Sequence, residues 1–159
     1  MKKPLTPGEA LNKAAAYCTL CERCSSEVST KLTAWGVPSS EQKKIITRLI
    51  EEKFIDEERY CRAFVNDKVK FNRWGRIKIT ATLREKHLPQ EHIKEALHNI
   101  DEEIYLQTLK ETIDIKRREL KNKDDITTQQ KIIRHAASRG FEPALIFSTL
   151  RYNGDEMDI

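Results

Sequence analysis

Three cysteines spaced three residues apart are the group in this chain that most resembles a reactive site. They are Cys18, Cys21 and Cys24, and the only other cysteine, Cys61, lies far along the sequence. Structural zinc takes four ligands, usually from two separated pairs, and iron–sulfur clusters also use four cysteines. On a helix Cys18 and Cys21 would share one face, where a reduced thiol packs as a small apolar side chain. We therefore predict core thiols, with no metal site and no cofactor.

Other residue types that could perform catalysis are dispersed. The four histidines are His87, His92, His98 and His135. They show no spacing typical of metal ligands, and the five glycines stand singly, so no phosphate-binding loop is present. Carboxylate pairs such as Glu51-Glu52 and Asp124-Asp125 stand beside lysines, as on solvated helix faces. The sequence predicts that the protein is not an enzyme.

One segment carries a strong local charge. From residue 68 to residue 86, seven lysines and arginines are opposed by a single carboxylate, which gives a local charge of +6, and Phe71 and Trp74 are interleaved with them. Such cations neutralise phosphates or acidic protein surface, while an exposed tryptophan stacks on a base or anchors an interface. The predicted partner-binding residues are Lys68, Lys70, Arg73, Trp74, Arg76, Lys78, Arg84 and Lys86.

A plainer interpretation of the same segment stays open. Single-signed clusters are common on solvated helix faces, and Trp74 could be a core residue. Lys70, Arg73 and Arg76 surround a predicted turn, so they cannot all face one way. Trp35, at the corresponding turn earlier in the chain, is predicted to pack between helices.

The composition indicates which elements must position these residues. Charged residues make up 34% of the 159 residues, the hydrophobic set makes up 38%, and there are only five glycines and five prolines. This mixture favours amphipathic helices. Three phrases beginning at Lys31, Thr82 and His135 resemble one another, at offsets of 51 and 53 residues. The aligned apolar rows are Val28/Ile79/Ile132, Leu32/Leu83/Ala136, Val37/Leu88/Phe141 and Ile46/Leu97/Leu150. We predict an all-α fold of tandem three-helix repeats.

Capping signals divide the chain into three predicted repeats, residues 1–55, 56–100 and 101–152, followed by a frayed acidic tail at 153–159. The predicted helices of the first repeat are 6–23, 25–34 and 39–53. Those of the second repeat are 56–71, 75–86 and 89–99. Those of the third repeat are 101–121, about 127 onward and 143–151. Thr6 with Glu9, Ser39 with Gln42 and Thr127 with Gln130 are the expected capping pairs. Because fifty-residue units bury little core alone, neighbours should stack into an elongated rod.

Charge and hydropathy give a first indication of location. The net charge is +3 for residues 1–55, +3 for 56–100 and −2 from 101 onward, so we place the positive charge in the first two thirds. No apolar stretch reaches the roughly 20 residues of a membrane span, and no signal core follows the basic start. We predict a cytoplasmic protein without membrane contact.

Several phrases resemble the RecX family of bacterial recombination regulators. They run from Ala14 to Tyr17, from Glu27 to Val37, from Leu49 to Tyr60, from Ala63 to Val65 and from Trp74 to Leu88. The likeness covers about residues 10 to 150. The family often has glycine where Lys53 and His87 stand, leucine where Cys18 follows Tyr17, and Asp-Asp where Asp56-Glu57 stands here.

The resemblance implies tandem three-helix repeats in a curved rod. It also implies a monomeric regulator, acting in DNA repair and the SOS response, that binds the RecA recombinase and its filament and inhibits ATP hydrolysis and strand exchange. Single- or double-stranded DNA would be met through phosphates. The alternative is a helix-turn-helix-like DNA-binding transcription regulator, which short helix triplets and a basic second unit would also suit.

Overall fold

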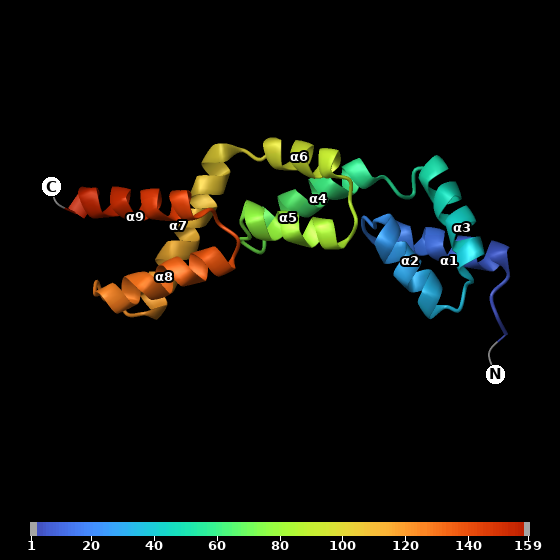
Figure 1. The fold of residues 1–159 in the computed structure, drawn as a ribbon, viewed down its shortest axis with the longest axis horizontal. Helices are drawn as coiled ribbons and strands as arrows, with labels where there is room; N and C mark the ends of the chain where they lie inside the picture. The colour runs from blue at the N-terminus through green and yellow to red at the C-terminus, as the bar shows by residue number, and fades with distance from the viewer. Residues whose placement is uncertain (1–2, 158–159) are drawn as a thin grey trace. The chain divides into compact units, whose positions relative to one another are not determined.

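The computed structural model describes residues 3–157, with side chains up to Arg151, and within that range the protein is all-α (Figure 1). Nine helices, and no strands, are present in those residues: α1 (Pro7–Leu20), α2 (Ser25–Ala34), α3 (Ser39–Glu51), α4 (Glu57–Lys70), α5 (Arg76–Glu85), α6 (Gln90–His98), α7 (Glu102–Glu119), α8 (Ile126–Ser138) and α9 (Pro143–Met157). No helix of the described chain is both long and apolar enough to cross a bilayer.

The predicted all-α fold class is confirmed, and the helices begin within one residue of the predicted positions. Thr6 caps α1, its hydroxyl accepting the Glu9 N–H at 3.2 Å. Asp101 caps α7 by accepting the N–H groups of Glu103 and Ile104. The last helix extends beyond the predicted end at Arg151, through Met157. The final residues of the predicted tail, Asp158 and Ile159, lie outside the described residues.

Two predicted capping pairs are wrong. Ser39 does not cap α3, which follows Pro38, and Gln42 turns inward, where its Nε2 donates to the Val37 carbonyl at 2.8 Å. Burial of that amide satisfies a loop carbonyl that solvent cannot reach. α8 is capped by Asp125, whose carboxylate accepts the Thr128 N–H at 2.7 Å, and not by Thr127 with Gln130.

The rows aligned by the internal repeat share one environment. The first two rows, Val28/Ile79/Ile132 and Leu32/Leu83/Ala136, are fully buried. In the row Val37/Leu88/Phe141, no residue is more than 7% exposed. The fourth row, Ile46/Leu97/Leu150, is half-buried throughout. Equal burial at equal positions is what a repeated packing unit requires.

The chain forms two compact units, 1–63 with 83–94 and 64–82 with 95–159. In the first, which we call unit 1, α1, α2 and α3 pack pairwise around a core that includes Ala14, Val28, Leu32 and Leu49. In unit 2, α7 packs on α8 and α8 on α9, and fully buried Tyr105, Ile113, Ile132 and Phe141 fill the interior.

A close backbone contact inside unit 2 fixes the start of α5. The Gly75 N–H donates to the Arg139 carbonyl at 2.8 Å, and the Ile77 N–H donates to the Gly140 carbonyl at 3.0 Å. A Cβ on Gly75 would lie 2.3 Å from the backbone of Gly140. Glycine is therefore required at this position by space, since any side chain would separate the two segments.

Candidate interaction surface

The structure places the eight predicted partner-binding residues in both units. Unit 2 holds Lys68, Lys70, Arg73, Trp74, Arg76 and Lys78, and unit 1 holds Arg84 and Lys86. Their surroundings differ sharply: some cations are paired with carboxylates, whereas others have none.

The ammonium groups of two of the predicted lysines lie over the ring of Trp74. The Nζ atoms of Lys68 and Lys78 lie 4.8 Å and 4.4 Å from the centre of its ring. Phe64 meets the ring edge-on, with centroids 6.3 Å apart, and Trp74 is half-buried. The ring is held there because the Trp74 backbone N–H follows α4 and donates to the Lys68 carbonyl at 3.0 Å. Each ammonium over the ring gains about 0.5 to 1 kcal/mol at an exposed site, so the aromatic group concentrates positive charge.

The end of α4 adds exposed apolar surface beside these cations. Lys70 is exposed, and Phe71 next to it leaves 77% of its surface in solvent. Ile77, on α5, is 52% exposed. Arg73 adopts a φ of 52° and its Nε lies 3.7 Å from Glu111, in an ion pair with both side chains nearly half exposed. Basic and apolar groups close together on one segment are typical of a protein-binding surface.

Arg76 is held by other residues of unit 2. Its guanidinium donates to Glu142 at 2.8 Å and also to Glu102, and it lies 3.8 Å over the ring of Tyr105. The Tyr105 hydroxyl donates to Glu142 and accepts the Arg76 N–H. Burial, and then the neighbouring Glu142 carboxylate, raise the pKa of Tyr105. Arg76 therefore joins α5 to α7 and to the Glu142 carboxylate just before α9, and the sequence pattern gives no sign of these long-range pairs.

In unit 1, Lys86 is likewise paired and Arg84 is not. Lys86 Nζ lies 3.3 Å from the Glu27 carboxylate, with both side chains mostly buried, whereas exposed Arg84 donates to the Gln90 side chain at 3.2 Å. Burial alone would raise the pKa of Glu27, but the Cys24 N–H and the Lys86 ammonium outweigh it, and the pKa is lowered.

The cysteines are not arranged as a ligand set. Cys18, Cys24 and Cys61 are buried, and burial raises the pKa of each thiol, that of Cys61 to about 12. These three are therefore neutral thiols near pH 7. Cys21 is exposed, so the predicted shared buried face for Cys18 and Cys21 is wrong: α1 ends at Leu20, one residue before Cys21.

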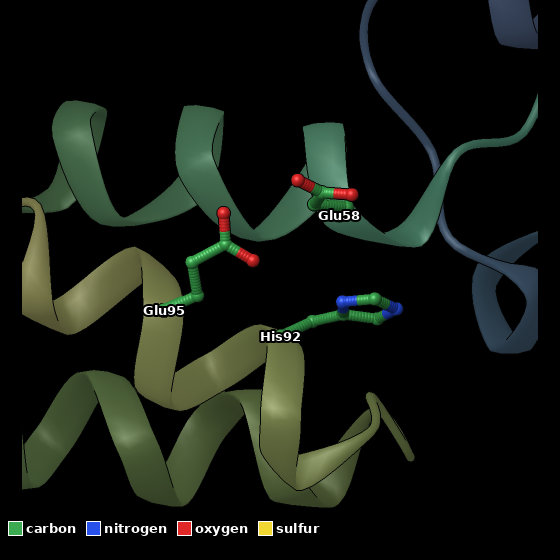
Figure 2. Close-up of side chains that lie close together, drawn as sticks. All are labelled: Glu58, His92 and Glu95. Atoms are coloured by element: carbon green, nitrogen blue, oxygen red, sulfur yellow. The ribbon is translucent and has the colours of Figure 1, made fainter.

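Among the described residues, the one group with metal-like spacing involves α4 and α6 (Figure 2). Glu58 and His92 offer ligand atoms within 4.8 Å of each other, and Glu95 follows His92 by three residues. Arg62 already forms an ion pair with Glu58 at 3.4 Å. Because a guanidinium supplies the positive charge that this carboxylate needs, we assign no ion to the group.

Comparison with known protein families gives a consistent match. The family model for the second three-helix domain of RecX matches residues 56–97. Regulatory protein RecX of Prosthecochloris aestuarii is 27% identical over 142 residues, which cover 89% of this chain and 91% of that protein. The namesake from Lactobacillus johnsonii is 25% identical over 107 residues, which cover 67% of this chain but only 40% of that longer protein.

Solved structures give the same result for the fold. The crystal structure of RecX from Lactobacillus salivarius superposes with a TM-score of 0.79 at 18% identity, covering 92% of this chain and 95% of the other. A crystal structure of a regulatory protein RecX gives 0.80 at 20% identity, covering 91% of this chain and 74% of the other. A family-specific domain, relatives aligned along most of the chain and a shared helical fold agree with the quoted phrases. The predicted resemblance to the RecX family is therefore confirmed: in sequence and in fold, this chain is similar to RecX regulatory proteins.

Proposed function

We propose that this chain binds a RecA recombinase and its filament on DNA, and that it inhibits ATP hydrolysis and strand exchange. The family relationship supports a regulatory role, since the relatives bear the name regulatory protein RecX. The observation that carries the binding proposal is the cationic and aromatic segment from Lys68 to Lys78 of unit 2.

The composition of that segment suits a filament made of acidic protein surface and phosphate. Among the described residues, Lys68, Lys70 and Lys78 form no ion pair with a carboxylate, so their charge remains available to a partner. Phe71 adds an exposed apolar anchor. Cations speed and orient association while a buried aromatic supplies much of the affinity. The surface we propose consists of Lys68, Lys70, Phe71, Trp74 and Lys78.

A filament multiplies weak contacts. Each recombinase subunit would present the same site again, and tandem helical units could meet successive copies. Linked contacts then act at high effective concentration, so modest individual affinities add up to tight binding. Occupation of the filament in this way would block the second DNA strand or the rearrangements coupled to ATP.

The test uses purified RecA, single-stranded DNA and ATP. Stoichiometric wild-type protein should slow ATP hydrolysis and co-sediment with filaments. The double variant Lys70→Glu/Lys78→Glu should lose both effects, because it reverses the charge of exposed Lys70 and of half-buried Lys78 over Trp74. Lys43→Glu/Lys44→Glu makes the same charge change on exposed positions of α3 and should behave as wild type.

Two results would count against the proposal. The first is wild-type protein without effect on hydrolysis or filaments. The second is tight, sequence-specific binding to duplex DNA in the absence of RecA, which would favour a transcription regulator. Arg76 is left unchanged in these variants because it holds Glu102 and Glu142, so its loss would mix unfolding with lost binding.

A further inference from the structure

A second basic surface lies in unit 2, on α7 and α8. α7 and α8 pack together, and between them is an open depression. It is lined by Lys116 from α7 and by Lys131, Arg134, His135 and Ser138 from α8. The other three α8 positions follow Lys131 by three, four and seven residues, which places all four along one face of the helix.

The charge of this region is strongly one-sided. From residue 116 to residue 139, eight lysines and arginines are opposed by three carboxylates, a net charge of +5. Lys131 and Arg134 form no ion pair with a carboxylate of the described chain. Lys116 Nζ lies 3.3 Å from Glu119, whose side chain is 60% exposed. Such a surface pair is weak and a stronger anion can replace it.

His135 reports the local electrostatic potential from inside the depression. Its pKa is lowered first by burial and then by Lys116 and Arg139, with only Glu119 acting in the opposite sense. An anion bound among these cations would oppose that effect, so the imidazole is a built-in probe of occupancy.

We propose that the depression between α7 and α8 binds the sugar–phosphate backbone of a nucleic acid, with Lys116, Lys131 and Arg134 neutralising phosphates. No large apolar side chain lines it. Protein interfaces depend on buried apolar anchors, whereas phosphate contacts need only well-placed cations. The depression is open to solvent and suits an extended chain of phosphates. This site rests on the proposed function, since it would be where the chain itself meets the DNA of the filament. It is tested without recombinase, so that failure of this contact and failure of recombinase binding can be told apart.

The test is a titration without recombinase. Fluorescence anisotropy follows a labelled single-stranded oligonucleotide and the matching duplex at several salt concentrations. Lys131→Glu/Arg134→Glu should weaken binding roughly tenfold or more at low salt and reduce the salt dependence by about two charges. Circular dichroism checks that the helices of this variant are intact.

Two further variants make the result specific. Lys110→Glu/Arg151→Glu applies the same charge change to other exposed positions of unit 2 and should leave affinity within about twofold apart from long-range effects. Lys70→Glu/Lys78→Glu should leave the α7–α8 contact in place. If that variant abolishes binding while Lys131→Glu/Arg134→Glu retains it, the inference is overturned.

Nuclear magnetic resonance of His135 gives an independent readout. Addition of the oligonucleotide should raise the pKa of His135 in the wild-type protein and leave it unmoved in Lys131→Glu/Arg134→Glu. Inorganic phosphate is tested alongside, as is poly-glutamate. A response to phosphate alone, or to poly-glutamate but not to the oligonucleotide, would show a small-anion site or an acidic-protein surface and would refute the proposal.

Discussion

One backbone position recurs at the end of the second helix of each predicted repeat. Gly36, His87 and Gly140 occupy the same place in the three aligned phrases, and their φ angles are 79°, 61° and 96°. Lys53, after α3, has a φ of 62°. A left-handed residue closes a helix, but only glycine adopts that conformation without a steric cost. His87 and Lys53 stand where the RecX resemblance expects glycine, and both are left-handed.

His87→Gly is expected to raise the free energy of unfolding by about 0.5 to 1 kcal/mol, and Lys53→Gly by a similar amount, because each relieves a positive φ. Urea denaturation measures the effect. Lys43→Gly, at an exposed position inside α3, should instead lower stability by about 1 kcal/mol. If His87→Gly destabilised the protein as much as this control, the left-handed turn would not be strained.

A second residue-scale effect depends on pH. Glu27 accepts the Cys24 N–H at 3.2 Å and pairs with Lys86, and its pKa is lowered. A lowered folded-state pKa means that the stabilisation is complete above the unfolded pKa of about 4.3 and is lost as pH falls through the folded value. Glu27→Gln should therefore cost about 1 to 3 kcal/mol at pH 7 and much less at pH 3.

Denaturant unfolding of wild type and Glu27→Gln at both pH values checks this difference. Glu41→Gln, at the start of α3, is the control and should show little change at either pH. An equal loss for Glu27→Gln at pH 7 and pH 3 would mean that its packing, and not its charge, stabilises the fold.

At the scale of elements, the sequence predicts helices well because their apolar spacing is local. The predicted capping of α1 by Thr6 depends on residues three apart and is confirmed. Prediction fails where a tertiary contact replaces a local one. The Gln42 side chain donates to the buried Val37 carbonyl and does not form the predicted capping pair with Ser39. Arg76 looks like a surface cation in sequence, but it pairs with carboxylates 26 and 66 residues away. Such pairs depend on how the helices pack against one another, and the local sequence pattern carries no information about that packing.

The contact between Gly75 and Gly140 is the sharpest test of how elements meet in unit 2. Gly75→Ala would place a Cβ 2.3 Å from the Gly140 backbone, where no flexible side chain can yield. We expect a loss of about 2 to 3 kcal/mol or more, as for overpacked cores. The measurement is thermal and urea unfolding, with exchange of the amides of Gly75 and Ile77, which donate across this contact.

Gly8→Ala is the matched control for Gly75→Ala. Gly8 lies in α1, and a Cβ added there would have nothing within 4 Å, so alanine should raise stability by about 0.5 to 1 kcal/mol. If both substitutions changed stability by the same amount, close approach would not be what selects glycine at position 75.

At the scale of the whole molecule, the distribution of charge was harder to predict than the fold. Summed over residues 101–159, the net charge is −2, which predicts that the positive charge lies earlier in the chain. The acidic residues concentrate at the start of α7 and near the C-terminus, however, and residues 116–139 carry +5. Charge acts over about a Debye length of 10 Å, so a local surface, not a unit average, decides what binds.

The two cores make a further prediction about cooperativity. Leu32 is fully buried among α1, α2 and α3 in unit 1, and Ile113 is fully buried in α7 of unit 2. Truncation of either to alanine should cost about 2 to 5 kcal/mol locally. In repeat proteins stability is approximately a sum of unit and nearest-neighbour terms, so local opening remains local.

Hydrogen exchange measured helix by helix distinguishes local from global coupling. Leu32→Ala should speed exchange across α1–α3 and leave α7–α9 protected, and Ile113→Ala should do the reverse. This pattern would let one part of the chain adjust to a partner while the other keeps its surface intact, as the proposed binding at several points along a filament would require. If either variant sped exchange equally in α1–α3 and in α7–α9, the helices would unfold as one cooperative whole, and neither group of helices could adjust independently.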